Sequence, residues 1–492
     1  MAEEKEKSPV SVPCLGYETM SEFWELIHDL LGGTLAMRKA GQTWLPIETC
    51  ESATAYDTRL GRSILYNGFR DTLNKLSNKP FTHPVRLTEL PEELAYLEDD
   101  VDGNNKPLDV FIKEVLTNLI EYGIAHILVD HSEIEIEAGK QLTLADEKRL
   151  GVRVYLINIS PKSLIGWQSE KISKSVELTQ IRFKETVVEP NGDYGDIEAN
   201  YINVYNKENF ELHKQDSDNE DKYDRIAEKT YSFHKIPLVT IYANKTGFMT
   251  AEPPLIDLAW LNLSHWQSSS DQKNILRFSR FGLLFGRGLP DKIVKTGALD
   301  IGPSKAILTS EKEADLKYVE HTGKSIEAGA KDIEDTENKM RVLGNQPLMK
   351  VIPNTATAER IDESRTVSQL QSWIRALERG MKQVLTFACE WRKIQPNEDM
   401  DVNIYSDFEA MVIGNSDKDL LLKIRQAGEI TRERFLKEEQ RRGVFSLDME
   451  AEEEARAAEA EDANDLKNLL PEDDLEQGTE DEDLELEPDD EE

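Results

Sequence analysis

Apolar side chains recur every three or four residues along the first part of the chain, a spacing that is typical of amphipathic helices. Three such helices are predicted: 17–31, ended by Gly32-Gly33; 56–76, followed by Pro80 and Pro84; and 108–122, which stops at Gly123. The apolar stretch 124–129 directly after the third helix predicts a buried strand. We therefore expect a helical N-terminal part that leads into a sheet.

Between residues 152 and 241 the pattern changes to short segments rich in β-branched residues, which indicate strands. The segments are 152–159, 176–183, 201–205 and 238–242. Two turn-rich pieces separate them, Pro190-Asn191-Gly192-Asp193 and the charged stretch 214–224. This part is expected to be a small sheet-containing domain with exposed loops.

Two helices in the middle of the chain are too polar for an ordinary core. One is predicted over 252–280, where Pro253-Pro254 suits a helix start, and its stretch 267–274 is polar all round. The other, 325–343, has only a thin apolar stripe, and a Gly- and Pro-punctuated, β-like insert over 282–318 separates the two. Such helices gain burial if identical subunits pack around an axis through a heterologous, closing interface. A monomeric helical hairpin that projects into solvent is the alternative, and the pattern alone does not choose between them.

Helical spacing returns over 356–393, about 57 Å if the helix is continuous, with apolar steps that resemble a coiled coil. A strand over 402–405 and a helix pair over 417–442, broken at Gly428, follow. The fold class predicted from these elements is α+β, mainly helical.

Charge divides the 492-residue chain into a body and a tail. The formal net charge is −36, and residues 446–492 carry 23 acidic against two basic residues. The body is therefore only moderately acidic. Such a chain does not coat DNA non-specifically, because that requires many Lys and Arg contacts to phosphates. A body of this charge can still surround DNA without gripping it.

Motifs that carry chemistry are incomplete. Gly297 and Gly302 have P-loop spacing, but Pro303 stands where the phosphate-binding Lys belongs. Asp100-Val101-Asp102 resembles the start of a calcium loop without its later ligands, so a plain acidic turn is favoured. His126 and His131 are expected on opposite faces of a strand. We therefore expect no catalytic residues, no metal site, no cofactor and no enzymatic activity.

The three cysteines lie far apart, no N-terminal apolar stretch resembles a signal peptide, and no apolar run approaches the roughly 18–20 residues that span a bilayer. These features predict a soluble protein made in a reducing cytoplasm, with no membrane partner.

Several segments, in order, resemble the portal (head-to-tail connector) proteins of tailed double-stranded DNA bacteriophages. The resemblance spans about residues 17–445. The segments are Tyr56-x-x-Arg59-Leu60 with 63–69, Lys79-Pro80-Phe81, the turn 99–103, 123–130, Ile236-Pro237-Leu238-Val239, 253–259, 263–274 and the long helix ending near Trp391.

The resemblance implies a portal-like architecture with a wing, a two-helix stem, a small α/β clip, a long helix with a tunnel loop, and a helical crown. The implied regions are an N-terminal arm 1–16, wing 17–251, stem helix 252–280, clip 281–322, second stem helix 323–343, tunnel loop 344–357, long helix and return to the wing 358–414, crown 415–463 and an acidic disordered tail 464–492.

The resemblance also implies a function: a ring, typically of twelve subunits, at one capsid vertex of the virion, assembled in the host cytoplasm. Implied partners are the terminase large subunit, a neck adaptor, the major capsid protein, a scaffold protein, and double-stranded DNA in the channel. Candidate DNA-channel residues are Lys273, Arg277, Arg280 and Lys350. Candidate clip-docking residues are Arg287, Lys292, Lys295 and Lys305. Basic residues outnumber acidic ones by five over 272–295, and these cations are expected to face DNA, a protein partner or solvent.

Two other classes remain open at this stage. An acidic DNA-mimicking or scaffold-type binding protein would be built around the tail, and an enzyme would use a site without a known motif. The first leaves residues 1–445 unexplained, and the second requires clustered carboxylates with perturbed pKa values in a closed pocket.

Overall fold

Helices and antiparallel sheets together make up the described structure, which agrees with the mixture of α and β elements that the sequence predicts. The computed structural model describes residues 7–131, 153–230, 235–280, 283–287, 313, 315–319, 324–346, 368–406, 408, 422–427, 429–441 and 454–458. The chain divides into two compact units, Met1–Ser406 and Asp407–Glu492.

The first helices differ from their predicted limits. They are α1 (Leu15–Ala40), α2 (Ala53–Leu60), α3 (Gly68–Asn78) and α4 (Leu108–Tyr122), with single turns at Pro9–Ser11, Gly41–Thr43, Lys79–Thr82 and Glu92–Leu97. The helical backbone is interrupted where Gly32-Gly33 predicted, because Gly33 has a φ of 75° and a ψ of −158°, and a second helical piece follows up to Ala40. The continuous helix over 56–76 was wrong. The chain breaks after Leu60, and Asn67 starts α3 anew by accepting a hydrogen bond from Arg70 N at 3.0 Å.

The end of α4 agrees with the prediction. Gly123 adopts a φ of 79° and turns the chain into β2 (Ile124–His131). This strand lies between β3 (Val154–Ile159) and β9 (Leu238–Tyr242) in an antiparallel sheet, and its first six residues are buried. The sheet therefore forms an internal layer, which α4 and α9 (Gln369–Arg392) contact.

The β-rich part is more regular than the sequence suggested. Five strands form one antiparallel meander: β4 (Leu164–Ile172), β5 (Ser175–Asn191), β6 (Gly195–Asn206), β7 (Asn209–Asp216) and β8 (Asn219–Thr230). The turn at 192–194 was predicted. The charged stretch 214–224 was expected to be a loop, but it forms a β-hairpin in which Lys214 lies opposite Asp224, and Lys214 makes an ion pair with Glu189 of β5 at 2.8 Å.

The core joins the two sheets. One cluster consists of Leu128, Ile159, Leu164, Ile181, Phe183, Ile236, Leu238 and Met249, which come from both sheets and the segments beside them. A second cluster, around Trp24 of α1 and Tyr122 of α4, contains Met20, Ile124 and Ala251. The short pairs β1 (Arg86–Thr88) with β14 (Asp401–Asn403) and β10 (Lys245–Gly247) with β11 (Thr250–Ala251) complete the described sheet structure of this region.

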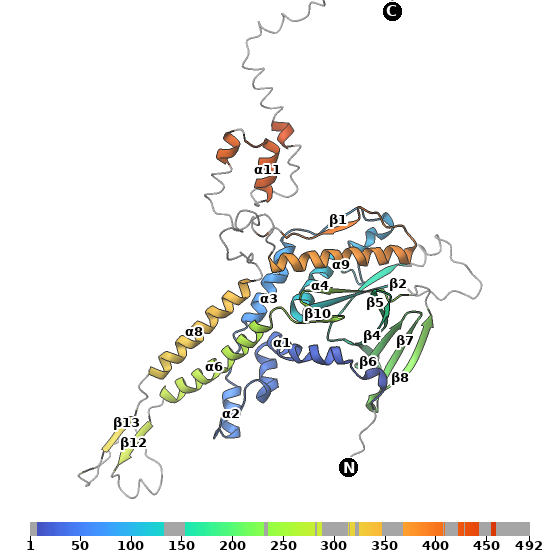
Figure 1. Ribbon diagram of the computed structural model, residues 1–492. Helices are drawn as coiled ribbons and strands as arrows, with labels where there is room; N and C mark the ends of the chain where they lie inside the picture. Colours follow the sequence, from blue (N-terminus) through green and yellow to red (C-terminus); the bar gives the residue numbers. More distant parts are fainter. Residues whose placement is uncertain are drawn as a thin grey trace, which may run out of the picture. The chain divides into compact units, whose positions relative to one another are not determined.

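The two central helices were predicted nearly to their limits. They are α6 (Ile256–Arg280) and α8 (Lys324–Asn345), and they lie side by side (Figure 1). His265 approaches Glu337 and Gln272 contacts Ile326, so the helices run antiparallel. Beyond their ends, β12 (Leu283–Arg287) pairs with β13 (Asp315–Val319). The tunnel loop lies mostly outside the described residues, and α8 continues two residues past its predicted end at 343.

The long helix is described from Gln369 to Arg392 as α9, whose Ser368 and Gln371 form a capping box. Its predicted first part, 356–367, lies outside the described residues. In the second unit, 422–426 and α11 (Arg432–Arg441) are helical, as predicted for 417–442. The strand predicted over 402–405 is β14, displaced by one residue at its start. Residues 459–492 of the acidic tail lie outside the description.

Candidate functional site

The site is built on α6, whose first half is anchored in the core. Asn262 is fully buried; its Oδ1 accepts from Phe69 N at 2.9 Å, and its Nδ2 donates to Tyr66 O at 2.9 Å. Trp266, one turn further along, is also fully buried. These contacts fix the segment between α2 and α3 against α6, because they join its backbone to a buried side chain of that helix.

The polar second half of α6 is buried in part by its own chain. Gln272 Nε2 donates to Ile326 O of α8 at 2.7 Å, and Gln267 Nε2 donates to Trp44 O at 2.7 Å. Ser270 Oγ lies 2.8 Å from Ser63 Oγ, and both serines are buried. Part of the polar stretch 267–274 is therefore buried within the protomer, whereas Asp271 and Lys273 are exposed. Hydrogen bonds to backbone groups let polar side chains pack inside the protomer.

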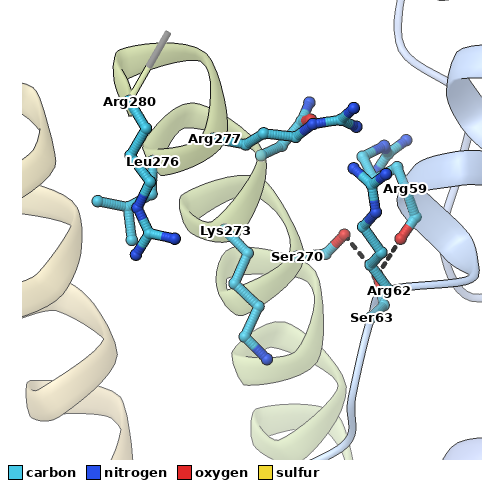
Figure 2. Close-up of a pocket in the computed structure, with 9 residues that line it drawn as sticks. Arg59, Arg62, Ser63, Ser270, Lys273, Leu276, Arg277 and Arg280 are labelled. Carbon is cyan, nitrogen blue, oxygen red and sulfur yellow. Dashed lines mark hydrogen bonds between the residues drawn. The ribbon is translucent and has the colours of Figure 1, made fainter.

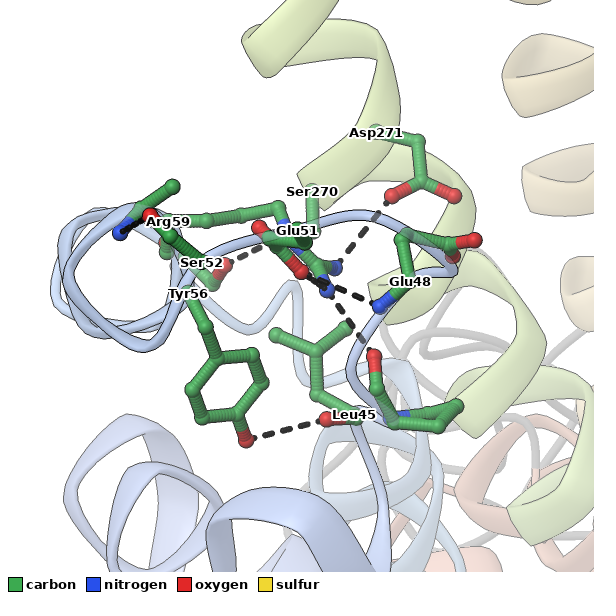
Figure 3. Close-up of polar contacts among 11 residues, drawn as sticks. Leu45, Glu48, Glu51, Ser52, Tyr56, Arg59, Ser270 and Asp271 are labelled. Carbon is green, nitrogen blue, oxygen red and sulfur yellow. Dashed lines mark hydrogen bonds and ion pairs between the residues drawn. The ribbon is translucent and has the colours of Figure 1, made fainter.

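Arg59 is the charged centre of this region (Figure 3). Its Nε and Nη2 donate to the two carboxylate oxygens of Glu51 at 2.9 and 2.7 Å, Nη2 also donates to Pro46 O at 2.9 Å, and Nη1 lies 3.4 Å from Asp271 Oδ1 of α6. The side-chain hydrogen bond from Arg59 lowers the pKa of Glu51, whereas burial raises the pKa of Asp271. The fork geometry of an Arg suits this bidentate contact.

A basic groove opens between α6 and the segment that follows α2. It is lined by Arg59, Arg62, Ser63, Ser270, Lys273, Asn274, Leu276, Arg277 and Arg280, and its volume is about 350 Å³. Figure 2 shows Arg277 extending from α6 towards the segment that bears Arg59 and Arg62. We call this the basic groove. It brings together Lys273, Arg277 and Arg280, three of the four DNA-channel candidates.

Sequence reasoning missed Arg59 and Arg62 as members of the groove. Arg59 appeared only within a segment of the resemblance, and Arg62 was not singled out. Both belong to a part of the chain about two hundred residues before α6, and no spacing rule connects the two. The run of small polar residues 267–274 was a signal that α6 has a polar neighbour, but it did not say which segment that is.

The exposed cations of the groove carry an uncompensated charge. Within the described part of the chain, Arg62, Lys273, Arg277 and Arg280 have no carboxylate within ion-pair distance, whereas Arg59 is neutralised by Glu51 and Asp271. The groove therefore attracts anionic groups, either phosphates or carboxylates. Ser63 Oγ donates to Arg59 O at 2.9 Å, so the hydroxyl is held by the backbone rather than by a base.

The other predicted site residues are less informative. Arg287 in β12 pairs with Glu313 at 3.0 Å, and both side chains are well exposed. A surface pair of this kind contributes little to stability. Lys292, Lys295, Lys305 and Lys350 lie outside the described residues.

The remaining motifs have structural partners. Asp100 accepts from Gly103 N and Asn105 N at 2.8 and 3.0 Å and pairs with Arg153 at 2.8 Å, which is the geometry of a plain acidic turn. His126 is buried and its Nδ1 lies 3.1 Å from Thr240 Oγ1, whereas His131 stacks on Trp391. Among the described residues, no group of three or more His, Cys, Asp or Glu is placed to hold a metal ion.

None of the helices described here is both long enough and apolar enough to cross a membrane.

Comparisons with known proteins add the following. A family model described as "Domain of unknown function (DUF4055)" matches residues 254–392, the stretch that contains α6, β12, β13, α8 and α9. No curated protein matches the chain.

Solved structures of gene transfer agent (GTA) particles align with most of the chain at low similarity. The virion of the native particle gives 12% identity and a TM-score of 0.38, covering 83% of this chain and 93% of that chain. The neck of the native particle, computed with C12 symmetry, gives 12% identity and a TM-score of 0.38, and the match covers 82% of this chain and 97% of that chain. The neck of the empty particle, computed with C6 symmetry, gives 11% identity and a TM-score of 0.35, and the match covers 80% of this chain and 99% of that chain. TM-scores of this size do not establish a shared fold.

Proposed function

We propose that this protein is the portal subunit of a phage-like particle. In this role, identical copies form a closed ring at one vertex, and the genome enters and leaves through its axis. The observation that carries the proposal is the antiparallel pair α6 and α8, which ends in the hairpin β12–β13 and is anchored at its other end in the core through Asn262 and Trp266. A two-helix stem with a small β element at its tip is the arrangement that the sequence resemblance implies.

The surface of the stem also supports assembly. Lys273, Arg277 and Arg280 on α6 are exposed, and Ile275 between them keeps 38% of its surface accessible although it is apolar. Trp260 on the same helix is 49% exposed. Large apolar side chains interleaved with unpaired charges are more typical of a surface that meets a partner than of one that faces only water.

Partners follow from the proposed role. The terminase large subunit and a neck adaptor would dock at the clip, and double-stranded DNA would pass along the axis. DNA contact by Lys273, Arg277, Arg280 and Lys350, and docking by Arg287, Lys292, Lys295 and Lys305, stay predictions. In this role the protein is a virion component, and it acts as a conduit rather than as an enzyme.

The deciding experiment is the mass of the purified native assembly. A closed ring of about twelve copies of the 56.1 kDa chain has a mass near 670 kDa, which native mass spectrometry or mass photometry resolves from neighbouring ring sizes. A species that stays monomeric across all concentrations contradicts the proposal. A variant truncated after Phe445 tests the acidic binding protein as the alternative. Ring formation without the tail supports the portal, because the charge of the tail is then not required for assembly.

A further inference from the structure

The helix pair carries opposite charges on its two members. On α6, the exposed Lys273, Arg277 and Arg280 join Arg62 at the basic groove. On α8, the residues that pack inward are Thr336 and Met340, whereas the carboxylates of Glu327, Asp332, Glu334 and Asp335 are exposed. Lys331 is the exposed cation among these four acids, and Lys339 and Arg341 are exposed nearer the core, where Arg341 pairs with Glu337. One protomer therefore has a basic face on α6 and a net acidic face over residues 327–335 of α8.

These two charged faces are unpaired within the protomer. None of Glu327, Asp332, Glu334 or Asp335 lies within ion-pair distance of a cation among the residues that the structure describes. The contact between the helices is made instead by Gln272 with Ile326 O and by His265 with Glu337. The outward charges are thus available to another molecule.

The level of the charges along the stem suits a rotational neighbour. Gln272 contacts Ile326 in the antiparallel pair, so Lys273 stands level with Ser325, about 3 Å along the axis from the level of Glu327. The other acids lie further towards the core, whereas Arg277 and Arg280 lie further towards the hairpin. Side chains lean towards the N-terminus of their helix. In an antiparallel pair this moves the basic groups towards the core and the acidic groups towards the hairpin, which brings the two sets closer in level. Rotation about an axis parallel to the stem changes no level, so Lys273 of one copy and Glu327 of the next copy would keep this match in level.

The composition of the groove favours protein over nucleic acid. Leu276 lines it, Ile275 beside it is 38% exposed, and Ile64, next to Ser63, is 57% exposed. Phosphates gain nothing from aliphatic side chains, whereas a protein partner buries them at about 25 cal/mol per Å². A carboxylate-bearing helix with apolar neighbours therefore satisfies both the charge and the aliphatic lining.

We propose that the basic groove binds the acidic face of α8 from the adjacent copy of the chain, with Lys273 and Arg62 meeting Glu327. This contact rests on the proposed ring and names its interface. It is heterologous, since one protomer contributes the groove and the next contributes α8.

Charge reversal tests the contact in the full chain. Lys273→Glu with Arg277→Glu makes the groove acidic, and Glu327→Lys with Glu334→Lys makes α8 basic. Each double variant is expected to raise the subunit dissociation constant at least about 10-fold in 150 mM salt and to yield monomers where the wild type forms rings. The combined fourfold variant is expected to restore rings. Lys171→Glu with Lys174→Glu, two exposed positions on the meander, is the matched control that should leave the ring mass unchanged.

Mixing gives the sharpest readout. In either double variant alone, the groove and α8 carry charges of the same sign. In an equimolar mixture, the acidic groove of the first variant meets the basic α8 of the second, and the basic groove of the second meets the acidic α8 of the first. The mixture should form rings in which the variants alternate, with equal numbers of each by native mass spectrometry. Circular dichroism melting of each variant shows whether the protomer is folded.

Three outcomes overturn the inference. The first is that both double variants form rings at the concentration at which the wild type forms them. The second is that the fourfold variant and the mixture both stay monomeric although their protomers are folded. Loss of DNA retention by the groove variant while its ring persists assigns the cations to DNA instead. A monomeric wild type is a different result, because it contradicts the proposed function itself.

Discussion

Arg59 holds both carboxylate oxygens of Glu51, at 2.9 and 2.7 Å, beneath the basic groove. The side chain of Arg59 is 3% exposed and that of Glu51 is 10% exposed, so the pair is buried. The same guanidinium reaches Pro46 O and Asp271, which links the segment before α2 to α6. The cation at the base of the groove is thus paired, whereas Arg62, Lys273, Arg277 and Arg280 at its rim are exposed.

Replacing Arg59 should unfold this base. Arg59→Met leaves the Glu51 carboxylate without its partner, and breaking a buried pair in this way costs about 3 kcal/mol of unfolding free energy. Urea denaturation measures the loss. Lys75→Met, which breaks the exposed pair Lys75–Asp71, is the control and should change stability by less than about 1 kcal/mol. Equal effects for the two variants would show that burial of the Arg59 pair is not the cause.

Two glycines with the same backbone conformation should respond differently to alanine. Gly123 has a φ of 79°, and a Cβ there would lie 2.2 Å from Glu252 O, whereas Gly192 has a φ of 72° with nothing within 4 Å. Gly192→Ala should cost about 1 kcal/mol, the strain of a left-handed residue. Gly123→Ala adds a clash with backbone and should cost about 3 kcal/mol or more. Thermal melting ranks them, and a larger loss for Gly192→Ala would contradict the explanation.

Asn262 should not tolerate replacement by its acid. Asn262→Asp keeps an acceptor for Phe69 N but places an oxygen opposite Tyr66 O, and it introduces a charge at a fully buried position. The expected loss is about 3 kcal/mol, since an unsatisfied buried group bears its full desolvation cost. Chemical denaturation provides the measurement. Asn78→Asp, at an exposed position, is the matched control; a similar loss there would exclude burial as the reason.

The burial of His126 predicts that the protein loses stability in mild acid. Burial lowers its pKa from 6.5 to about 3, so between these values the unfolded chain binds a proton that the folded chain does not. Stability from this group is therefore full above pH 6.5 and falls as pH drops towards 3, by about 1.4 kcal/mol for each pH unit below the unfolded pKa. Urea midpoints at pH 7.0 and 5.5 should differ more in the wild type than in His126→Gln.

The exposed His28 provides the comparison for that titration. His28→Gln should retain the dependence of the wild type, because His28 lies at the surface and folding does not remove its side chain from water. If His126→Gln and the wild type show the same change between the two pH values, protonation of His126 is not its origin.

The sequence predicts elements well where a residue marks their limits. Gly123 ends α4 where expected, because its left-handed conformation is needed there. The break between α2 and α3 was missed, since Leu60, Ile64 and Leu65 keep a helical period although the backbone between them is not helical. Periodicity reports which side chains are apolar and does not report where hydrogen bonds stop.

For the functional site too, the sequence predicts some features and misses others. Lys273, Arg277 and Arg280 share a helix, so their spacing places them together, and the groove contains all three. Arg62 joins them only through tertiary contacts. The polar residues of α6 indicated an unusual environment, but the sequence could not distinguish burial against another copy from burial against Trp44, Ser63 and Ile326 of the same chain.

The pairing of α6 with α8 links their lengths. Because the chain runs outwards along one helix and back along the other, an insertion of a whole turn, about 5.4 Å, in α6 moves the hairpin β12–β13 outwards only if α8 grows equally. An unmatched insertion shifts Gln272 past Ile326 and uncouples the register. Natural variation in this protein should therefore add or remove turns in both helices at once, so the reach of the tip changes in discrete, paired steps.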